Sequence, residues 1–152
     1  EMAALAARHG AAVVAMANMR GYPHEDIIEA VLTQLRESIT IAERAGIPPE
    51  RVIIDPGFGF GTTPTENLTM VRSLHVLKCL DRPILIGPSR KSTIGLVLDL
   101  PVQERVEGTA ATIAIAIDRG ADIVRVHDVP VMVRVARMTD AITRGWTPPQ
   151  NN

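Results

Sequence analysis

Short apolar runs alternate along the chain with longer segments whose apolar residues recur every three or four positions. Four runs rich in Val, Ile and Leu have the length and composition of buried parallel strands, at 12–16, 51–55, 82–87 and 122–128. Helices are predicted between and after them, at 25–45, 63–80, 102–119 and 130–145. The clearest helix signals are the apolar stripe of 25–45 and the capping-box pattern of Thr63 and Glu66.

The regular alternation of strands and helices predicts an α/β fold with a parallel sheet and right-handed crossovers. A (βα)8 barrel uses about 31 residues per strand-helix unit, so this chain holds about half of one. The alternative is a small open doubly wound sheet. We favour half of a (βα)8 TIM barrel, with four parallel strands alternating with helices. No G-x-G-x-x-G motif follows a strand, and polar residues follow all four strands. One domain is expected over 1–145, with a disordered tail over 146–152.

Composition narrows the class of protein. Hydrophobic residues make up 46% of the 152 residues and aromatic residues 3%, enough for one core built from aliphatic side chains. A formal net charge of −1 gives no indication of binding to nucleic acid or to an anionic membrane. No apolar run approaches the ~20 residues of a membrane span, and we expect a cytoplasmic protein. Cys79, the single cysteine, excludes an internal disulfide and is expected to be a buried thiol.

Charged and hydroxyl-bearing residues gather where each predicted strand ends. Asp55 ends the second strand, the segment 87–92 (GPSRKS) follows the third, and Arg125 and His127 lie on the fourth. The carboxyl ends of parallel barrel strands share one face, so these groups are expected to converge on a single mouth.

Asp55 is followed by the loop Gly57-Phe58-Gly59-Phe60-Gly61, which we call the glycine loop. An isolated carboxylate beside an apolar strand is costly unless donors satisfy it. A planar ligand with two adjacent N–H groups, such as a 2-amino-4-oxopyrimidine edge, would do so. Glycines would let the backbone approach such a flat ligand. The alternative is that Asp55 only caps the following turn.

Arg125 and His127 are two residues apart, so on a strand their side chains would leave the same face and grip one anion together. Alternatively, Arg125 pairs with Asp55 or Asp128 as a structural bridge and His127 binds a carbonyl. Lys91 has an equally simple alternative, as a solvated cation on a surface loop.

The motifs IIDPGFGFG, ILIGPSRKSTIG, EGTAA and GADIVRVHDV, in this order and spacing, closely resemble the C-terminal half of dihydropteroate synthase. The resemblance covers nearly the whole chain and implies the fifth to eighth strands of a pterin-binding TIM barrel. It implies condensation of 6-hydroxymethyl-7,8-dihydropterin pyrophosphate with 4-aminobenzoate, with release of pyrophosphate, in folate biosynthesis. It also implies Mg²⁺ beside the leaving group, and a homodimer.

The resemblance assigns roles to individual residues. It implies that Asp55, Gly59 and Lys91 bind the pterin. Phe60, Ser89 and Lys91 would line the aminobenzoate pocket. Arg125 and His127 would hold pyrophosphate and, together with Lys91, form the catalytic set.

Three features depart from the resembled pattern. Ala17-Asn18 stands where the family usually has Met-His, and Thr62 stands where a lysine usually ends the glycine loop. Strands one to four, which would bring the magnesium-binding asparagine, are missing, so no metal ligand is expected in this chain. Since the chain opens with Glu1 inside a helical pattern, we expect a piece of a longer protein with little or no activity alone.

Two other functions fit the same residues. One is the related pterin-binding barrel of corrinoid-dependent methyltransferases, which has no use for a pyrophosphate grip. The other is a non-catalytic pterin-binding or dimerisation domain, which Ala17, Asn18 and Thr62 mildly support.

Overall fold

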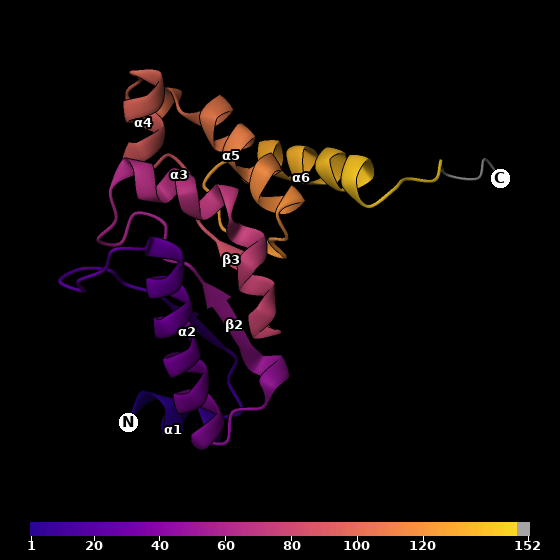
Figure 1. Ribbon diagram of the computed structural model, residues 1–152. Helices are drawn as coiled ribbons and strands as arrows, with labels where there is room; N and C mark the ends of the chain where they lie inside the picture. The colour runs from indigo at the N-terminus through magenta and orange to yellow at the C-terminus, as the bar shows by residue number, and fades with distance from the viewer. Residues whose placement is uncertain (149–152) are drawn as a thin grey trace.

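The computed structural model describes residues 1–148, and Figure 1 shows the strands running through the molecule with helices packed beside them. The elements follow in the order α1 (Met2–Arg8), β1 (Val13–Met16), α2 (Ile27–Arg44), β2 (Val52–Asp55), α3 (Pro64–Arg72), β3 (Leu85–Ile86), α4 (Ser92–Leu98), α5 (Val106–Asp118), β4 (Ile123–Val124) and α6 (Val129–Thr143), with 3-10 helices at Pro49–Arg51, Leu74–Leu80 and Val102–Glu104. The predicted tail at 146–152 lies partly outside the described residues.

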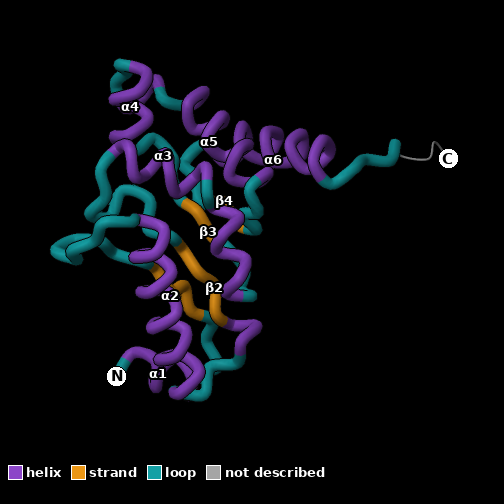
Figure 2. The backbone as a smooth tube through the Cα atoms, in the orientation of Figure 1, coloured by secondary structure: helices purple, strands orange, loops and turns teal. Residues whose placement is uncertain are grey.

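The strands are all parallel and neighbour one another in chain order. β1 pairs with β2 from Val13 opposite Val52 to Met16 opposite Asp55. A parallel bridge between Ile54 and Ile84 connects β2 to the start of the β3 segment, and β3 pairs with β4. The predicted α/β fold with a parallel sheet is therefore confirmed. Figure 2 shows the strands running one after another from the end near α1 toward α5.

The third and fourth strands are shorter than the apolar runs 82–87 and 122–128 predicted, because each segment loses its ladder partners early. Pro83 and Pro88 have no N–H to donate at either end of β3. Arg125 still donates its N–H to the carbonyl of Ile86. The N–H of His127, two residues on, donates to the side-chain hydroxyl of Ser89 and not to a strand carbonyl. Arg125 and His127 therefore lie in the loop after β4, and their predicted position on the strand itself is wrong.

Helix α2 covers one face of β1 and β2. Asp26 caps its first turn by accepting the N–H groups of Ile28 and Glu29, and its apolar stripe buries Leu35 completely. On the sheet, the buried Val52 and Ile54 of β2 alternate with Ile53. Ile53 pairs with Val14 of β1, whose side chain is 49% exposed. The face of the sheet away from α2 is thus partly open.

The helix predicted at 63–80 begins as expected but changes type. The capping box of Thr63 and Glu66 is confirmed, with both reciprocal hydrogen bonds present. The α-helix ends at Arg72, and Leu74–Leu80 continues as a 3-10 helix. Leu74 and Leu77 are buried there, and their spacing of three places both side chains on the same side of a 3-10 helix. Cys79 on this segment is exposed, so the prediction of a buried thiol is wrong.

The segment after β3 contains a helix that the sequence pattern did not predict. Helix α4 is short and carries Gly95 in its middle, which lowers its intrinsic propensity, so it depends on burial of Thr93 and Ile94. The predicted helix at 102–119 begins as a 3-10 turn and becomes α-helical only at Val106. α5 then packs beside α6, burying Ile113, Ile117 and Met132 between them (Figure 1).

No helix among residues 1–148 is long and apolar enough to cross a membrane.

Candidate functional site

Three of the predicted site residues come together from three strand ends. Asp55 is the last residue of β2, Lys91 is the N-cap residue of α4 after β3, and Arg125 follows β4 directly. Lys91 and Arg125 are both close enough to Asp55 to lower the pKa of its carboxyl by charge attraction. The parallel order of the strands brings these residues to one edge, as the sequence predicted.

Burial outweighs charge attraction in this cluster. It raises the pKa of Asp55 above its ordinary value, although a hydrogen bond from Gly57, Lys91 and Arg125 all act against it. Burial also lowers the pKa of Lys91, although attraction to Asp55 opposes it, while Arg125 adds to the lowering. A close ion pair would shift both groups the other way. The charges of Asp55 and Lys91 are therefore only partly neutralised by their surroundings. Such a site favours binding of a charged or polar ligand.

The Lys91 ammonium lies among the residues of the glycine loop. Its Nζ donates a hydrogen bond to the carbonyl of Phe58 and stands 4.4 Å from the centre of the Phe60 ring. The Cβ position of Gly59 is 3.1 Å from Lys91 Cδ, so the lysine stem runs directly against this glycine. Lys91 is thus held in a pocket of carbonyl and aromatic groups, not solvated on a surface loop.

The glycine loop lies on the segment that follows β1. Asp55 Oδ1 accepts the N–H of Gly57 at 2.8 Å, so the turn-capping role considered for Asp55 is present. A Cβ on Gly57 would stand 1.9 Å from the carbonyl oxygen of Ala17, and the φ of Gly57 is +77°. Both facts require glycine at this position. One carboxylate oxygen of Asp55 therefore shapes the loop, and the other has no hydrogen-bond partner within the described residues.

His127 and Ser89 form a separate contact beside the cluster. The Ser89 hydroxyl is 3.0 Å from His127 Nδ1 and accepts the backbone N–H of His127 at 3.2 Å. Ser89 is buried, so its hydroxyl is engaged by the histidine and orients the imidazole. The alternative considered for His127 was a hydrogen bond to a carbonyl. Its imidazole instead contacts the hydroxyl of Ser89. Arg125 and His127 both have exposed side chains.

Asp128 is paired with Arg90, so it is not available to Arg125. Arg90 Nε donates to Asp128 Oδ2 at 2.9 Å and Arg90 Nη2 donates to Asp128 Oδ1 at 2.6 Å. This bidentate pair lowers the pKa of Asp128 and raises that of Arg90. It also fastens the loop after β3 to the loop after β4, next to Lys91 and His127. The pair was not predicted, because it joins residues 38 positions apart.

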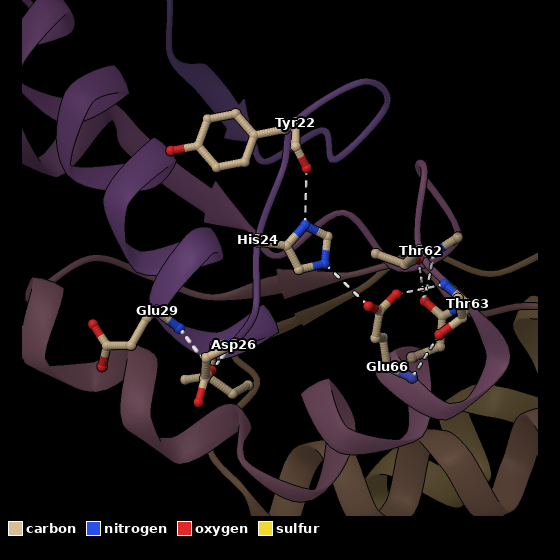
Figure 3. Close-up of polar contacts among 10 residues, drawn as sticks. Tyr22, His24, Asp26, Glu29, Thr62, Thr63 and Glu66 are labelled. Carbon is tan, nitrogen blue, oxygen red and sulfur yellow. Dashed lines mark hydrogen bonds and ion pairs between the residues drawn. The ribbon is translucent and has the colours of Figure 1, made fainter.

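His24 links the loop after β1 to α3. Figure 3 shows its ring between the carbonyl of Tyr22, at 2.9 Å, and the carboxylate of Glu66, at 3.0 Å. These contacts raise the pKa of His24, the carbonyl of Tyr22 having the largest effect. The pKa of Glu66 is lowered, first by the backbone of Thr63. The capping-box glutamate therefore also fixes the segment that precedes α2.

No group of three or more metal-ligating side chains occurs within residues 1–148.

Comparison with known proteins identifies the family. The chain belongs to the pterin binding enzymes, whose family model matches residues 1–127.

Within that family, it is similar to dihydropteroate synthases. It is 47% identical over 145 residues to the enzyme of Clostridium beijerinckii, covering 95% of this chain and 54% of the relative. It is 44% identical over 142 residues to that of Bacillus subtilis, covering 93% of this chain and 50% of the relative. The chain thus spans about half the length of the relatives it matches.

Solved dihydropteroate synthases share the fold. One from Clostridium difficile, crystallised in the presence of pteroic acid, superposes with a TM-score of 0.91 at 44% identity, over 94% of this chain and 55% of that structure. One from Xanthomonas albilineans with 4-aminobenzoic acid superposes with a TM-score of 0.87 at 37% identity, over 92% of this chain and 52% of that structure.

Proposed function

We propose that this chain is the C-terminal half of a (βα)8 barrel, forming one domain over 1–145, and that it carries much of the site of a dihydropteroate synthase. In that site the pterin binds at Asp55, Gly59 and Lys91. The arylamine lies against Phe60 and Lys91, with Ser89 holding the neighbouring histidine. Arg125 and His127 take the pyrophosphate.

The observation that carries the proposal is the partial charge compensation of Asp55 and Lys91. Asp55 has one free carboxylate oxygen for the N–H groups of a pterin edge, and the exposed Arg125 stands where an anion would add its charge to the cluster. Relatives of the same family are dihydropteroate synthases, and one solved neighbour contains 7,8-dihydropteroate at a TM-score of 0.88 and 35% identity.

The reaction needs no nucleophile from the protein. The bond between the pterin methylene carbon and the pyrophosphate oxygen breaks, and the electron pair leaves with pyrophosphate. The amine nitrogen of 4-aminobenzoate then forms a bond to that carbon and loses a proton. Arg125 and His127 stabilise the departing anion, which is the main catalytic contribution of this chain. Lys91, whose pKa is lowered by burial, borders both reacting molecules.

A hybrid enzyme tests the proposal directly. The region of the Bacillus subtilis relative that matches this chain is replaced by residues 1–145, and dihydropteroate formation from the two substrates is measured. We expect turnover in the hybrid and its loss in Asp55→Asn and Arg125→Ala variants. Circular dichroism and gel filtration establish that each variant is folded. A folded hybrid without turnover, or one that Asp55→Asn leaves unchanged, contradicts the proposal.

The 152 residues alone are expected to show little or no turnover. Within the described residues β1 pairs only with β2, and β4 only with β3, so each keeps an edge of unpaired backbone groups. The side chain of Val14 is also half exposed. Normal turnover of the isolated chain would refute this expectation. Bound Mg²⁺ beside the pyrophosphate would depend on ligands outside these residues.

The two alternative functions are separable in the same hybrid. A corrinoid-dependent methyltransferase domain would bind methyltetrahydrofolate without pyrophosphate, whereas the exposed Arg125 next to Lys91 favours a pyrophosphate ligand. A non-catalytic pterin-binding domain would bind pteroic acid without turnover. Isothermal titration with methyltetrahydrofolate, pteroic acid and pyrophosphate distinguishes these outcomes.

Helix α6 supports the proposal of a homodimer. Val131, Met138, Ile142 and Trp146 recur at helical spacing along one side of α6 and beyond its end, and all four side chains are exposed. A stripe of this kind is typical of an interface between copies. Analytical ultracentrifugation should find a dimer, and Ile142→Glu should convert it to monomer. A cytoplasmic location is proposed on the resemblance alone.

A further inference from the structure

One buried amide side chain connects the two sides of the Lys91 pocket. Asn67 lies in the first turns of α3 and is 2% exposed. Its Oδ1 accepts hydrogen bonds from the N–H of Gly59 at 2.7 Å and from the hydroxyl of Thr62 at 2.8 Å. Its Nδ2 donates to the hydroxyl of Thr93 at 3.0 Å. Three of its four hydrogen-bonding sites are therefore occupied, two by the loop between β2 and α3 and one by α4.

The partners of Asn67 lie on either side of the lysine. Gly59 stands between Phe58 and Phe60, whose carbonyl and ring hold the Lys91 ammonium. Thr93 is two residues beyond Lys91, in the first turn of α4. The Asn67 amide thus contacts both the glycine loop, which surrounds the Lys91 ammonium, and α4, which begins directly after Lys91.

We propose that Asn67 is a positioning residue: it holds the glycine loop against α4 and thereby keeps the Lys91 ammonium between the Phe58 carbonyl and the Phe60 ring. The catalytic meaning of this position rests on the proposed function, because it concerns Lys91 as a ligand-contacting group. The positioning itself rests only on the hydrogen bonds of the described residues.

The glycine loop is also held by Asp55, by Lys91 and by burial of the Phe58 side chain. Its backbone–backbone hydrogen bonds within the described residues are two, from the N–H of Met19 to the carbonyl of Phe60 and from the N–H of Phe60 to the carbonyl of Gly57. Neither reaches α4. Thr62, which stands where the resembled family usually has lysine, adds a second acceptor for the N–H of Gly59 at 3.1 Å and itself donates to Asn67. This departure from the family pattern therefore strengthens the same connection.

The chain offers a direct probe, because Lys91 and Lys78 are its only lysines. In the 152-residue chain labelled with ¹³C-lysine, the ε-methylene protons of Lys91 should be shifted upfield by the Phe60 ring current, and Lys78 serves as the internal reference. The pKa of both amines is read from the same signals. If the Lys91 ammonium leaves its place beside the Phe60 ring, the upfield shift should disappear. The pKa of Lys91 should then rise toward its ordinary value, because the amine becomes more hydrated.

The variants separate positioning from stability. Asn67→Leu removes all three hydrogen bonds at similar volume, and Thr93→Val removes only the bond to α4. Thr139→Val is the matched control, because Thr139 is also a buried helical threonine, with its hydroxyl bonded only to the carbonyl of Val135 in its own helix. We expect the Lys91 shift to be lost in Asn67→Leu, reduced in Thr93→Val and unchanged in the control.

An unchanged Lys91 signal in a folded Asn67→Leu chain overturns the proposal. Should that variant fail to fold, Thr93→Val decides alone, and an unchanged signal there has the same meaning. In the hybrid enzyme, Asn67→Leu should raise the KM for 4-aminobenzoate about tenfold, as expected for the loss of one to two net hydrogen bonds. A responsive Lys91 signal with an inactive hybrid refutes the proposed function and leaves the positioning intact. An active hybrid in which the Lys91 signal does not respond to Asn67→Leu refutes the positioning role and leaves the proposed function intact.

Discussion

Gly57→Ala should destabilise the fold strongly, because it adds a methyl group where the glycine loop touches the segment after β1. A non-glycine residue in the left-handed region costs about 1–2 kcal/mol, and the φ of Gly57 is +77°. The new Cβ would also stand 1.9 Å from the carbonyl oxygen of Ala17. Ala17 is 1% exposed and donates its N–H to the carbonyl of Asp55 at 2.9 Å, so its peptide cannot move away freely.

Overpacking of this kind costs about 1–3 kcal/mol in addition. We therefore expect the free energy of unfolding to fall by about 3–4 kcal/mol and the Tm by about 10 °C for a domain of this size. Thermal unfolding followed by circular dichroism, with urea unfolding as a second measure, gives both quantities.

Gly46→Ala is the matched control. Gly46 has a φ of +84° after the end of α2, and a Cβ there would meet no atom within 4 Å. Gly46→Ala should therefore lower the free energy of unfolding only by the cost of the left-handed backbone conformation, about 1–2 kcal/mol. The reasoning is refuted if the two substitutions lower the Tm equally, because the close approach of the glycine loop to Ala17 would then contribute nothing.

Three further predictions concern charge. Because burial raises the pKa of Asp55, its contribution to stability is fully present below the ordinary value of 3.8 and is lost as the pH rises through the raised pKa. Asp55→Asn should therefore unfold at a higher temperature than the parent at pH 7 but not at pH 3, although it binds no pteroic acid. The pKa of His24 is raised, first by the carbonyl of Tyr22 and then by Glu66, so its contribution to stability is fully present below 6.5 and is lost as the pH rises through the raised pKa. Glu66→Gln should therefore reduce, but not abolish, the fall in Tm over that pH range. Arg90→Lys should keep the charge but lose the bidentate geometry to Asp128, so acid unfolding begins at higher pH than in the parent, whereas equal acid midpoints would exclude a role for that geometry.

Local patterns in the sequence determined the order of elements and the capping of the helices. The apolar stripe of α2 and the Thr63 capping box depend on residues within a few positions of one another, and both were predicted correctly. The short helix α4 escaped prediction, because its segment has no periodic stripe and is stabilised by burial of Thr93 and Ile94. The ends of β3 and β4 were also misjudged, since ladder hydrogen bonds depend on the neighbouring strand and not on the apolar run itself.

The site divides in the same way. By itself, the sequence predicted which charged residues gather at one edge, because Asp55, Lys91 and Arg125 each lie at or just after the end of a strand and parallel strands end at one edge. Only the tertiary structure decided how they are held: Arg90 with Asp128, His24 with Glu66, and Asn67 with Gly59 and Thr93. These contacts join residues that are distant in the chain or lie in adjacent turns, and their partners are chosen by three-dimensional proximity, which no local pattern encodes.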